Sequence, residues 1–290
     1  MEPDWDDLKA VLALVRAGSL AAAGAALGVN YTTVARRVAR AEEALGRQLF
    51  ERLADGYAPN EDARLVAAEA GAMEASAHRM ARRLAGSDER LEGTLTLTAP
   101  QLLIAHVLSP ALRTFREAHP DVDLRIRATN DMLDLSRREA DLAIRVSNSP
   151  GDNLTGLLLT EQHSASFASP DWSQRIKTSP DRPIDWILFE GQADLPKSVL
   201  DTWPASRIRY RFDDMIAMAG AAEAGLGVVR MPMFLGRTLP GLVQVPLIPP
   251  TPYWDIWMVA HPDVWPGAKV RAFRDVVRAD IKSRRALFTA

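Results

Sequence analysis

Apolar residues recur with a helical period near the start of the chain. Trp5, Leu8, Leu12 and Val15 are spaced by three or four residues, and the pattern stops before Gly18. This spacing predicts one amphipathic helix that buries its apolar stripe.

Residues 19–38 predict two further short helices joined by a tight turn. Ser19 is a good N-cap for the first, Gly28 can adopt the positive φ that ends it, and Asn30 is a good N-cap for the second. The polar face of the second helix carries hydroxyls and arginines: Thr32, Thr33, Arg36, Arg37 and Arg40. Short donors followed one turn later by arginines suit a helix in the major groove of DNA. The pattern therefore predicts a DNA-binding helix-turn-helix.

The segment RLADGYAP (52–59) predicts a hairpin with its turn at Asp55-Gly56. A hairpin in this place would be a wing that lies along the flanking phosphate backbone. A helical hairpin and a turn without any role in DNA binding is the alternative.

Residues 60–86 predict one long helix with an apolar seam. The seam residues are spaced alternately by four and three: Val66, Ala70, Met73, Ala77, Met80 and Leu84. A lone helix would leave this seam in water, so we expect it to pair with a second copy in a dimer. Packing on the chain's own domain is the alternative. Gly86 and Ser87 would end the helix, and residues 88–93 would form a polar hinge.

From Thr94 onward, strands alternate with helices. TLTLTAP predicts a strand that leads into a helix over 100–119; VDLRIRA (122–128), a helix near 133–139 and the strand DLAIRV follow. Further strands are expected at 164–167, 186–189, 207–212, 227–231 and 255–260, and helices at 214–224 and 268–281. This alternation is typical of a parallel sheet covered by helices. Such a chain can form two lobes with a ligand cleft between them.

Composition limits the possibilities without naming a function. The chain has 290 residues, of which 47% are hydrophobic and 25% charged, so it can form two or three domains. It has no cysteine, which excludes disulfides and thiolate zinc sites. The acidic start MEPDWDD is unlike a signal peptide, and no apolar run approaches the ~20 residues that span a bilayer. We expect a cytoplasmic protein that does not bind membranes.

The charge of the chain does not by itself indicate nucleic-acid binding, because the formal net charge is −2. Residues 1–60 contain seven basic and eight acidic side chains, with four acids in the first seven residues and five arginines between 36 and 52. Phosphate binding needs local positive charge, so we expect specific contacts in place of a broad electrostatic surface.

Catalytic motifs are missing from the sequence. Its five histidines are scattered, and we find no HExxH, GxSxG, P-loop or GxGxxG pattern. The acidic pair Asp213-Asp214 is explained by helix capping at one of the two positions. We expect no enzyme activity, no cofactor and no metal.

The order of these segments resembles the LysR-type transcriptional regulators over essentially the whole chain. GSLAAAGAALGVNYTTVARRVARAEEALGRQLFER is similar to the family's N-terminal motif in spacing and length. GTLTLTAP, LSPALRTFREAHPDVDLRIR, READLAIRV, SFASPDW and AMAGAAEAGLGVVRMP follow in the family's order. The resemblance implies an α/β protein with an N-terminal all-α winged helix-turn-helix, a dimerising linker helix and a two-lobed sensor domain like the periplasmic binding proteins.

With the resemblance, the expected domains can be given bounds. They are a DNA-binding domain (1–59), a dimerisation helix (60–87), a hinge (88–93) and an effector domain (94–290), whose lobe I is 94–162 with 266–290 and whose lobe II is 163–265. The implied partners are an operator in double-stranded DNA, a small-molecule effector, further copies of the chain in a dimer or tetramer, and RNA polymerase.

Some positions depart from the family's pattern. Gly24 replaces the common alanine where the two motif helices cross, a position that needs a small residue, at a cost in helix propensity of ~1 kcal/mol. Tyr31, Thr32 and Ala35 also differ from the usual residues, so the operator sequence cannot be transferred. Asp55 puts an acid in the wing where many relatives have a base.

We assign the DNA contacts as follows. Thr32, Thr33 and Arg36 would reach base edges or nearby phosphates, and an arginine can bind a guanine with two hydrogen bonds. The full expected set is Ser19, Asn30, Tyr31, Thr32, Thr33, Arg36, Arg37 and Arg52. For Arg40, the alternative is that its side chain lies in solvent near Glu43 and does not contact DNA.

We expect effector-binding residues where strands end at the cleft. They are Thr98, Pro100, Gln101, Thr129 and Arg145 from lobe I, with Phe212 and Arg230 from lobe II. The arginines and the helix start favour an anionic effector. The alternatives are that Thr98 and Gln101 only cap a helix and that both arginines pair with acids. A regulator without effector control and a solute-binding protein are the alternative functions.

Overall fold

The computed structural model describes residues 2–53, 56–86, 89–130, 135, 139–149, 151, 153–179 and 181–290. The chain divides into two compact units, Met1–Ala81 and Arg82–Ala290. None of the described helices combines the length and the apolar character that crossing a membrane requires.

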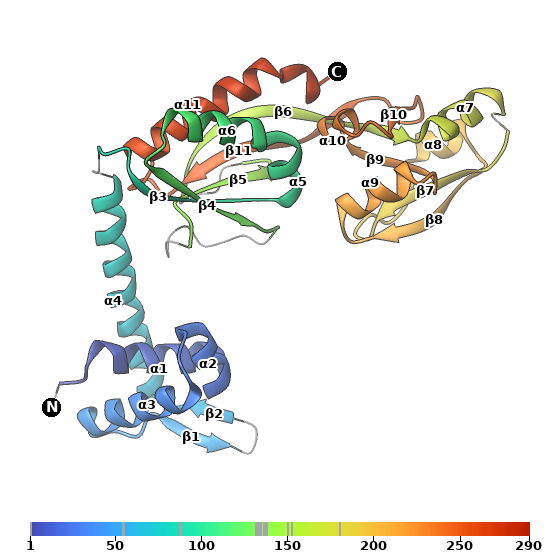
Figure 1. The fold of residues 1–290 in the computed structure, drawn as a ribbon. Coiled ribbons are helices and arrows are strands. Elements are labelled where there is room, and N and C mark those ends of the chain that lie inside the picture. Colours follow the sequence, from blue (N-terminus) through green and yellow to red (C-terminus); the bar gives the residue numbers. More distant parts are fainter. Residues whose placement is uncertain are drawn as a thin grey trace. The chain divides into compact units, whose positions relative to one another are not determined.

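The N-terminal unit contains the predicted helices and hairpin (Figure 1). Its elements are α1 (Trp5–Ala17), α2 (Leu20–Leu27), α3 (Tyr31–Leu45), β1 (Phe50–Leu53), β2 (Gly56–Pro59) and the start of α4 (Glu61–Gly86). Strands β1 and β2 pair antiparallel, with Arg52 opposite Tyr57. Asp55, expected in the turn, lies outside the described residues.

The predicted caps of the short helices are present. Ser19 Oγ accepts a hydrogen bond from the backbone N–H of Ala22 at 3.3 Å, and Asn30 Oδ1 accepts one from Thr32 at 3.0 Å. Gly28 ends α2 with a φ of 66°. These local bonds satisfy donors that a helix start otherwise leaves unpaired, so the sequence fixes where α2 and α3 begin.

Gly24 lies where α2 meets the segment before α3. A Cβ at this position would lie 2.8 Å from the carbonyl oxygen of Val29 and 3.2 Å from the backbone nitrogen of Tyr31. The close approach of two backbones therefore explains a glycine inside a helix, in agreement with the predicted need for a small residue.

The first turns of α4 pack inside the N-terminal unit. Ala67 and Ala70 are buried with Leu12 of α1, and Val66 contacts the core of the same unit. Val66 and Ala70 therefore pack against their own unit, which is the alternative to pairing in a dimer. Further along, the exposed fractions of Met73, Met80 and Leu84 are 47%, 62% and 65%, and Ala77 is exposed as well. Ser87, at the expected helix end, and Asp88, at the start of the expected hinge, lie outside the described residues.

The C-terminal unit is built on one mixed sheet with the strand order β4-β3-β5-β11-β6-β9-β7-β8, with β10 paired to β6. The strands are β3 (Gly93–Ala99), β4 (Val122–Ala128), β5 (Leu142–Ser147), β6 (Thr155–Ala168), β7 (Ile184–Phe189), β8 (Ser206–Phe212), β9 (Val228–Pro232), β10 (Val243–Gln244) and β11 (Thr251–Ala260). The helices are α5 (Gln101–Leu103), the π-helix η1 (Ile104–Leu108), α6 (Ser109–Ala118), α7 (Pro170–Thr178), α8 (Lys197–Thr202), α9 (Met215–Glu223), α10 (Met233–Thr238), α11 (Ala268–Ser283) and the 3-10 helix η3 (Arg285–Leu287).

Each lobe has a parallel core, as expected from the alternating strands and helices. Strand β3 pairs parallel with β4 and β5 in lobe I, and β7 pairs parallel with β8 and β9 in lobe II. The sheet as a whole is mixed, because β11 is antiparallel to both β5 and β6, and β6 is antiparallel to β9. The helix expected near 133–139 falls largely outside the described residues.

Strands β6 and β11 run from one lobe into the other (Figure 1). Residues 255–260 of β11, which we expected in lobe II, pair with 142–147 of β5 in lobe I. The hydrogen bonds of these two long strands therefore join the two lobes. Between the two parallel cores lie the residues at which β6 and β11 leave lobe II.

Candidate DNA interface and ligand cavities

The outer face of α3 carries the expected polar side chains. Tyr31, Thr32 and Arg36 are exposed, and Thr33 is half-buried. Within the part of the chain that the structure describes, the guanidinium of Arg36 makes neither a hydrogen bond nor an ion pair. Arg52 on β1 is exposed in the same way. These two arginines are available to an external anion.

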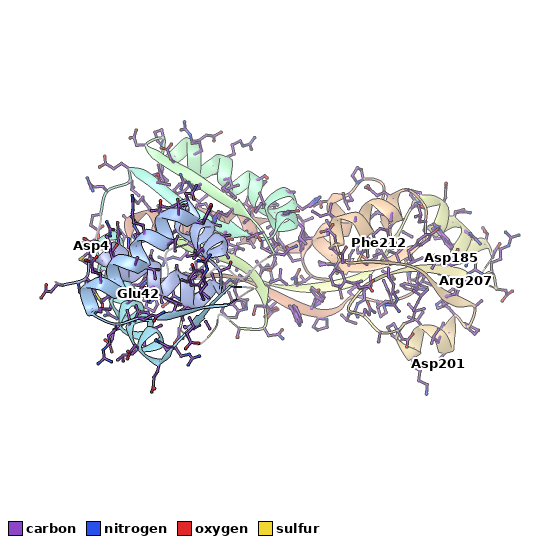
Figure 2. The ribbon with its side chains drawn as sticks, turned by 90° about the horizontal axis from the view of Figure 1, so that it is seen from below. Asp4, Glu42, Asp185, Asp201, Arg207 and Phe212 are labelled. Atoms are coloured by element: carbon purple, nitrogen blue, oxygen red, sulfur yellow. The ribbon has the colours of Figure 1, made fainter. Side chains whose placement is uncertain are left out.

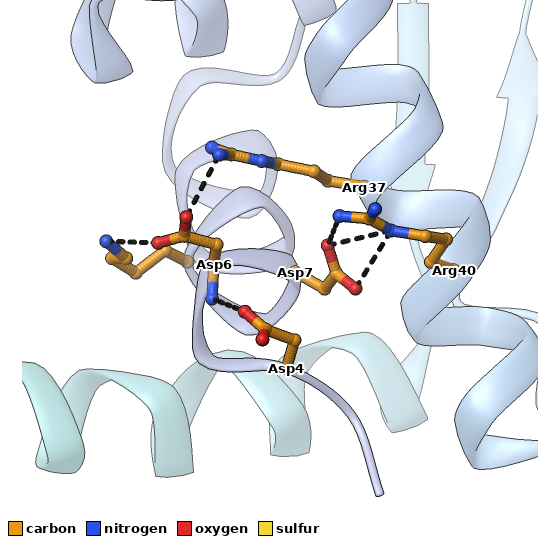
Figure 3. A network of polar contacts seen from close by, with 6 residues as sticks. Asp4, Asp6, Asp7, Arg37 and Arg40 are labelled. Carbon is orange, nitrogen blue, oxygen red and sulfur yellow. Dashed lines mark hydrogen bonds and ion pairs between the residues drawn. The ribbon is translucent and has the colours of Figure 1, made fainter. Parts of the chain in front are cut away.

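Arg37 and Arg40 are engaged within the unit (Figure 3). Arg37 Nη2 lies 3.0 Å from Asp6 Oδ2, and Arg40 donates to Asp7 through Nη2 at 2.5 Å and through Nε at 3.1 Å. The predicted phosphate contact of Arg37 thus competes with an internal ion pair. Arg40 pairs with a carboxylate on α1, and not with the nearby Glu43.

Both aspartates of α1 lie against cationic side chains. Asp6 also contacts Lys9 Nζ at 2.7 Å, and the hydrogen bond from Lys9 is the main reason that the pKa of Asp6 lies below its ordinary value. Asp7 is only 4% exposed, and its hydrogen bond raises the pKa of Arg40. Four charged groups on α1 and α3 therefore stabilise one another.

Two other predicted DNA-binding residues have structural partners. Ser19 and Asn30 use their side-chain oxygens as helix caps, and Thr32 Oγ1 donates to Asn30 Oδ1 at 3.0 Å. The two bonds to Asn30 orient the first turn of α3, which is the turn that would reach base edges.

Four of the predicted effector-binding residues line a cavity of about 310 Å³ in lobe I. They are Thr98, Pro100, Thr129 and Arg145. Ser147 and Ser149 add hydroxyls to the wall, and burial lowers the pKa of Arg145. The cavity therefore combines hydroxyl groups with one cationic side chain.

The alternative role of Thr98 and Gln101 as a capping pair was wrong. Pro100 is the N-cap of α5 and no side chain bonds to the helix start, whereas Thr98 Oγ1 donates to the carbonyl oxygen of Arg127 at 3.2 Å. The neighbouring strand β4 offers Thr98 an acceptor across the sheet, which a local sequence pattern does not show. Gln101 is exposed and is not among the residues that line the lobe I cavity.

Arg230 lies in a second cavity, of about 560 Å³, in lobe II. Its Nε donates to Ser164 Oγ at 3.0 Å, and its Nη2 donates to Thr251 Oγ1 at 2.8 Å. Among the described residues, no carboxylate pairs with Arg230. The alternative that this arginine is neutralised by an acid was therefore wrong for the described part of the chain.

Phe212, labelled in Figure 2, is at the end of β8 and lines neither cavity. It is half-buried and packs against the main hydrophobic core of the C-terminal unit. Its expected place over a ligand is taken by other aromatic residues of lobe II, namely Phe189, Tyr253 and Trp254.

The sequence reasoning missed the aromatic side of the second cavity. Tyr253 and Trp254 are adjacent in the segment TPYWD, and two neighbouring residues of a regular strand would face opposite sides of the sheet. The pair of aromatic residues before a strand was the available signal. Among the described residues, no group of three or more His, Cys, Asp or Glu side chains could hold a metal ion.

Comparisons with known proteins agree with this architecture. The family model described as "Bacterial regulatory helix-turn-helix protein, lysR family" matches residues 5–64, and the one described as "LysR substrate binding domain" matches residues 88–282.

Individual relatives cover most of the chain. The Mau operon transcriptional activator of Paracoccus denitrificans is 27% identical over 89% of this chain and 90% of its own length. The transcriptional regulator DsdC of Escherichia coli is 29% identical, with 91% and 90% covered. The solved structure of the virulence activator AphB from Vibrio cholerae matches with a TM-score of 0.58 at 21% identity, over 95% of this chain and 99% of that one, which supports the fold. With a helix-turn-helix unit followed by a two-lobed substrate-binding unit, the chain belongs to the LysR family of bacterial transcriptional regulators.

Proposed function

We propose that this regulator reads an operator through the outer face of α3 and that a small anionic effector in the two-lobed domain changes this binding. The residues proposed to contact DNA are Ser19, Asn30, Tyr31, Thr32, Thr33, Arg36, Arg37 and Arg52. RNA polymerase is the proposed partner on DNA, and the cytoplasm, where the chromosome is accessible, is the proposed location.

The state of Arg36 is the observation that carries the DNA-reading proposal. Its guanidinium is exposed six residues after the N-cap Asn30, while Arg37 and Arg40 are bound by α1. An exposed arginine without an internal partner can bind O6 and N7 of a guanine, which contributes about 1–3 kcal/mol of discrimination. We therefore assign base readout mainly to Arg36 and its neighbours Thr32 and Thr33.

Substitution of Arg36 tests this assignment. We expect Arg36→Ala to weaken operator binding at least tenfold in a gel-shift titration, without changing the thermal unfolding or the oligomeric state. Arg64→Ala removes the same charge from an exposed position of α4 and is the matched control. If both variants weaken binding equally, Arg36 contributes only general charge and is not a base-reading residue.

We also propose that two copies of the chain pair through α4. The support is the exposed apolar stripe of Met73, Ala77, Met80 and Leu84, which continues beyond the turns covered by α1. Paired helices would present two copies of α3 to a two-fold operator. Dimer or tetramer formation can be measured by analytical ultracentrifugation.

The proposed effector site is formed by the lobe I residues Thr98, Pro100, Thr129 and Arg145 and by Arg230 of lobe II. The two cavities lie near each other along β11, because Asp255, which follows Trp254, is the register partner of Ser147. Arginines and hydroxyl groups in both cavities favour an anion over a neutral or cationic effector.

A further inference from the structure

The hydrogen bonds of Arg230 leave its charge without a counterion in the described structure. Both of its partners, Ser164 and Thr251, are neutral hydroxyl groups. An arginine does not lose its proton in proteins, so a half-buried guanidinium keeps its charge here at any physiological pH. A ligand that supplies a negative charge would be favoured at this position.

The geometry of the remaining donors is suited to a carboxylate. A guanidinium has five N–H donors, and Ser164 and Thr251 occupy two nitrogens of Arg230 with one bond each. The donors that remain can bind both oxygens of one carboxylate in the paired arrangement that arginine prefers. Burial raises the pKa of Tyr253 against the opposing charge of Arg230, so its phenol stays protonated and can donate as well.

Aromatic side chains form the other walls of the lobe II cavity. Phe189, Tyr253 and Trp254 line it together with Met215 and Met231. The rings of Tyr253 and Trp254 are nearly parallel, with an interplanar angle of 21° and centroids 5.9 Å apart. Trp254 is 54% exposed, which is unusual for a side chain of this size and leaves its ring accessible.

An irregularity of β11 places these two rings on the same cavity. The pairing of β11 with β6 shifts register between Tyr253 and Ile256. In a regular strand Tyr253 and Trp254 would face opposite sides, whereas a bulge changes the direction of one side chain. Bulges are frequent next to binding sites for this reason.

We propose that the lobe II cavity binds an aromatic carboxylate, with its carboxylate on Arg230 and its ring against Tyr253 and Trp254. This inference rests on the proposed effector site and names the ligand class. A cavity of about 560 Å³ can hold an acid with one or two rings. A single arginine and neutral donors match a monoanion, and flat aromatic walls favour a planar ring over a saturated one.

Calorimetry and tryptophan fluorescence on the full-length protein test this inference. The probes are benzoate and indole-3-acetate, with cyclohexanecarboxylate as an equally charged saturated acid and benzamide as an uncharged aromatic. We expect at least one aromatic acid to bind about tenfold more tightly than both controls.

Variants identify the groups involved. Arg230→Gln should weaken binding of the aromatic acid at least tenfold, Arg230→Lys should weaken it less, and Trp254→Ala should remove the preference over cyclohexanecarboxylate. Arg209→Gln, on the exposed edge strand of the same lobe, is the matched control. Thermal unfolding of each variant separates loss of binding from loss of folding.

The inference is overturned if no aromatic acid binds more tightly than about 10 mM, or if Arg230→Gln binds it as well as the unchanged protein does. Binding of operator DNA, measured on the same preparation, separates failure of the ligand class from failure of the proposed function. If DNA binding depends on Arg36 and the acids do not bind, the ligand class fails while the DNA-reading proposal stands. If operator binding is also absent, the proposed function fails with it.

Discussion

Two groups of arginines, Arg37 and Arg40 on α3 and Arg230 in lobe II, are held by opposite kinds of partner. On α3, Arg37 and Arg40 are paired with the carboxylates of Asp6 and Asp7. In lobe II, Arg230 is fixed by the hydroxyls of Ser164 and Thr251. A carboxylate neutralises the cation, whereas a hydroxyl orients it and leaves its charge uncompensated. The first arrangement stabilises the contact between two helices, and the second prepares a site for an anion.

The same difference separates neighbouring residues of α3. Arg36 is exposed and makes no ion pair within the described residues, while Arg37 beside it contacts Asp6. The acidic N-terminus therefore reduces the positive charge that α3 presents to DNA. This explains how a segment with seven basic and eight acidic side chains in residues 1–60 can favour specific contacts over general attraction to phosphates.

The largest effect is expected when Arg230 receives a carboxylate as its partner, as Arg40 does from Asp7. Ser164→Asp places a carboxylate where the hydroxyl now accepts from Arg230 Nε, so the cation would be neutralised internally. We expect binding of aromatic acids to fall about a hundredfold, which is about 2.7 kcal/mol. Ser164→Ala, which removes the hydroxyl without adding charge, should have a smaller effect in the same calorimetric titration. Unchanged binding in Ser164→Asp would contradict the role of an uncompensated charge.

A smaller effect is expected when Arg37 is released from its carboxylate. Asp6→Asn should raise affinity for DNA by about three- to tenfold and make the salt dependence steeper by about one phosphate contact. Glu43→Gln changes the net charge equally on the exposed side of α3 and should leave the slope unchanged. In the double variant with Arg37→Gln the gain should disappear. Equal slopes for Asp6→Asn and Glu43→Gln in titrations at several salt concentrations would show that Arg37 is not withheld from DNA.

The smallest expected effect concerns the half-buried imidazole of His106, which, unlike the guanidinium of Arg230, can lose its charge. His106 Nδ1 lies 3.0 Å from Thr238 Oγ1, and burial lowers the pKa of His106 below its ordinary value. The unfolded chain therefore binds the proton more tightly than the folded one, so this contribution to stability is complete above the unfolded pKa and is lost as the pH falls through the folded pKa. We expect only a small loss of stability between pH 8 and pH 5, because His106 is half-buried and solvent weakens the effect of burial. Urea unfolding of His106→Gln should show a correspondingly weaker pH dependence; an identical dependence would assign the effect to other groups.

Local sequence patterns were sufficient for most of the fold. The N-caps Ser19 and Asn30 and the glycine at position 28 act through bonds to residues two to four positions away, so their effect is visible in the sequence itself. Asp214 likewise caps α9 by accepting from Ala217, which is three residues away. Most strands of each lobe also followed from the sequence pattern, whereas β10 and residues 155–163 of β6 were not expected.

The partners of the charged side chains could not be predicted in this way. Asp6 and Arg37 are 31 residues apart in the chain, and Arg230 and Ser164 are 66 apart. The sequence shows that acids are concentrated at the N-terminus, but not which arginine they meet. In the same way, the seam of α4 is uniform in sequence, and only the packing of α1 separates Ala70, which is buried, from Met80, which is exposed.

By itself, the sequence determined the order and kind of most elements, the helix-turn-helix and the LysR-like succession of motifs; it did not show α7, α8, α10 or β10. The tertiary structure decided which arginines are neutralised, which part of α4 stays exposed, and which aromatic residues share a cavity with Arg230. The physical reason is range: helix and strand periods and caps depend on neighbours within one turn, whereas ion pairs and the bulge in β11 depend on segments that only folding brings together.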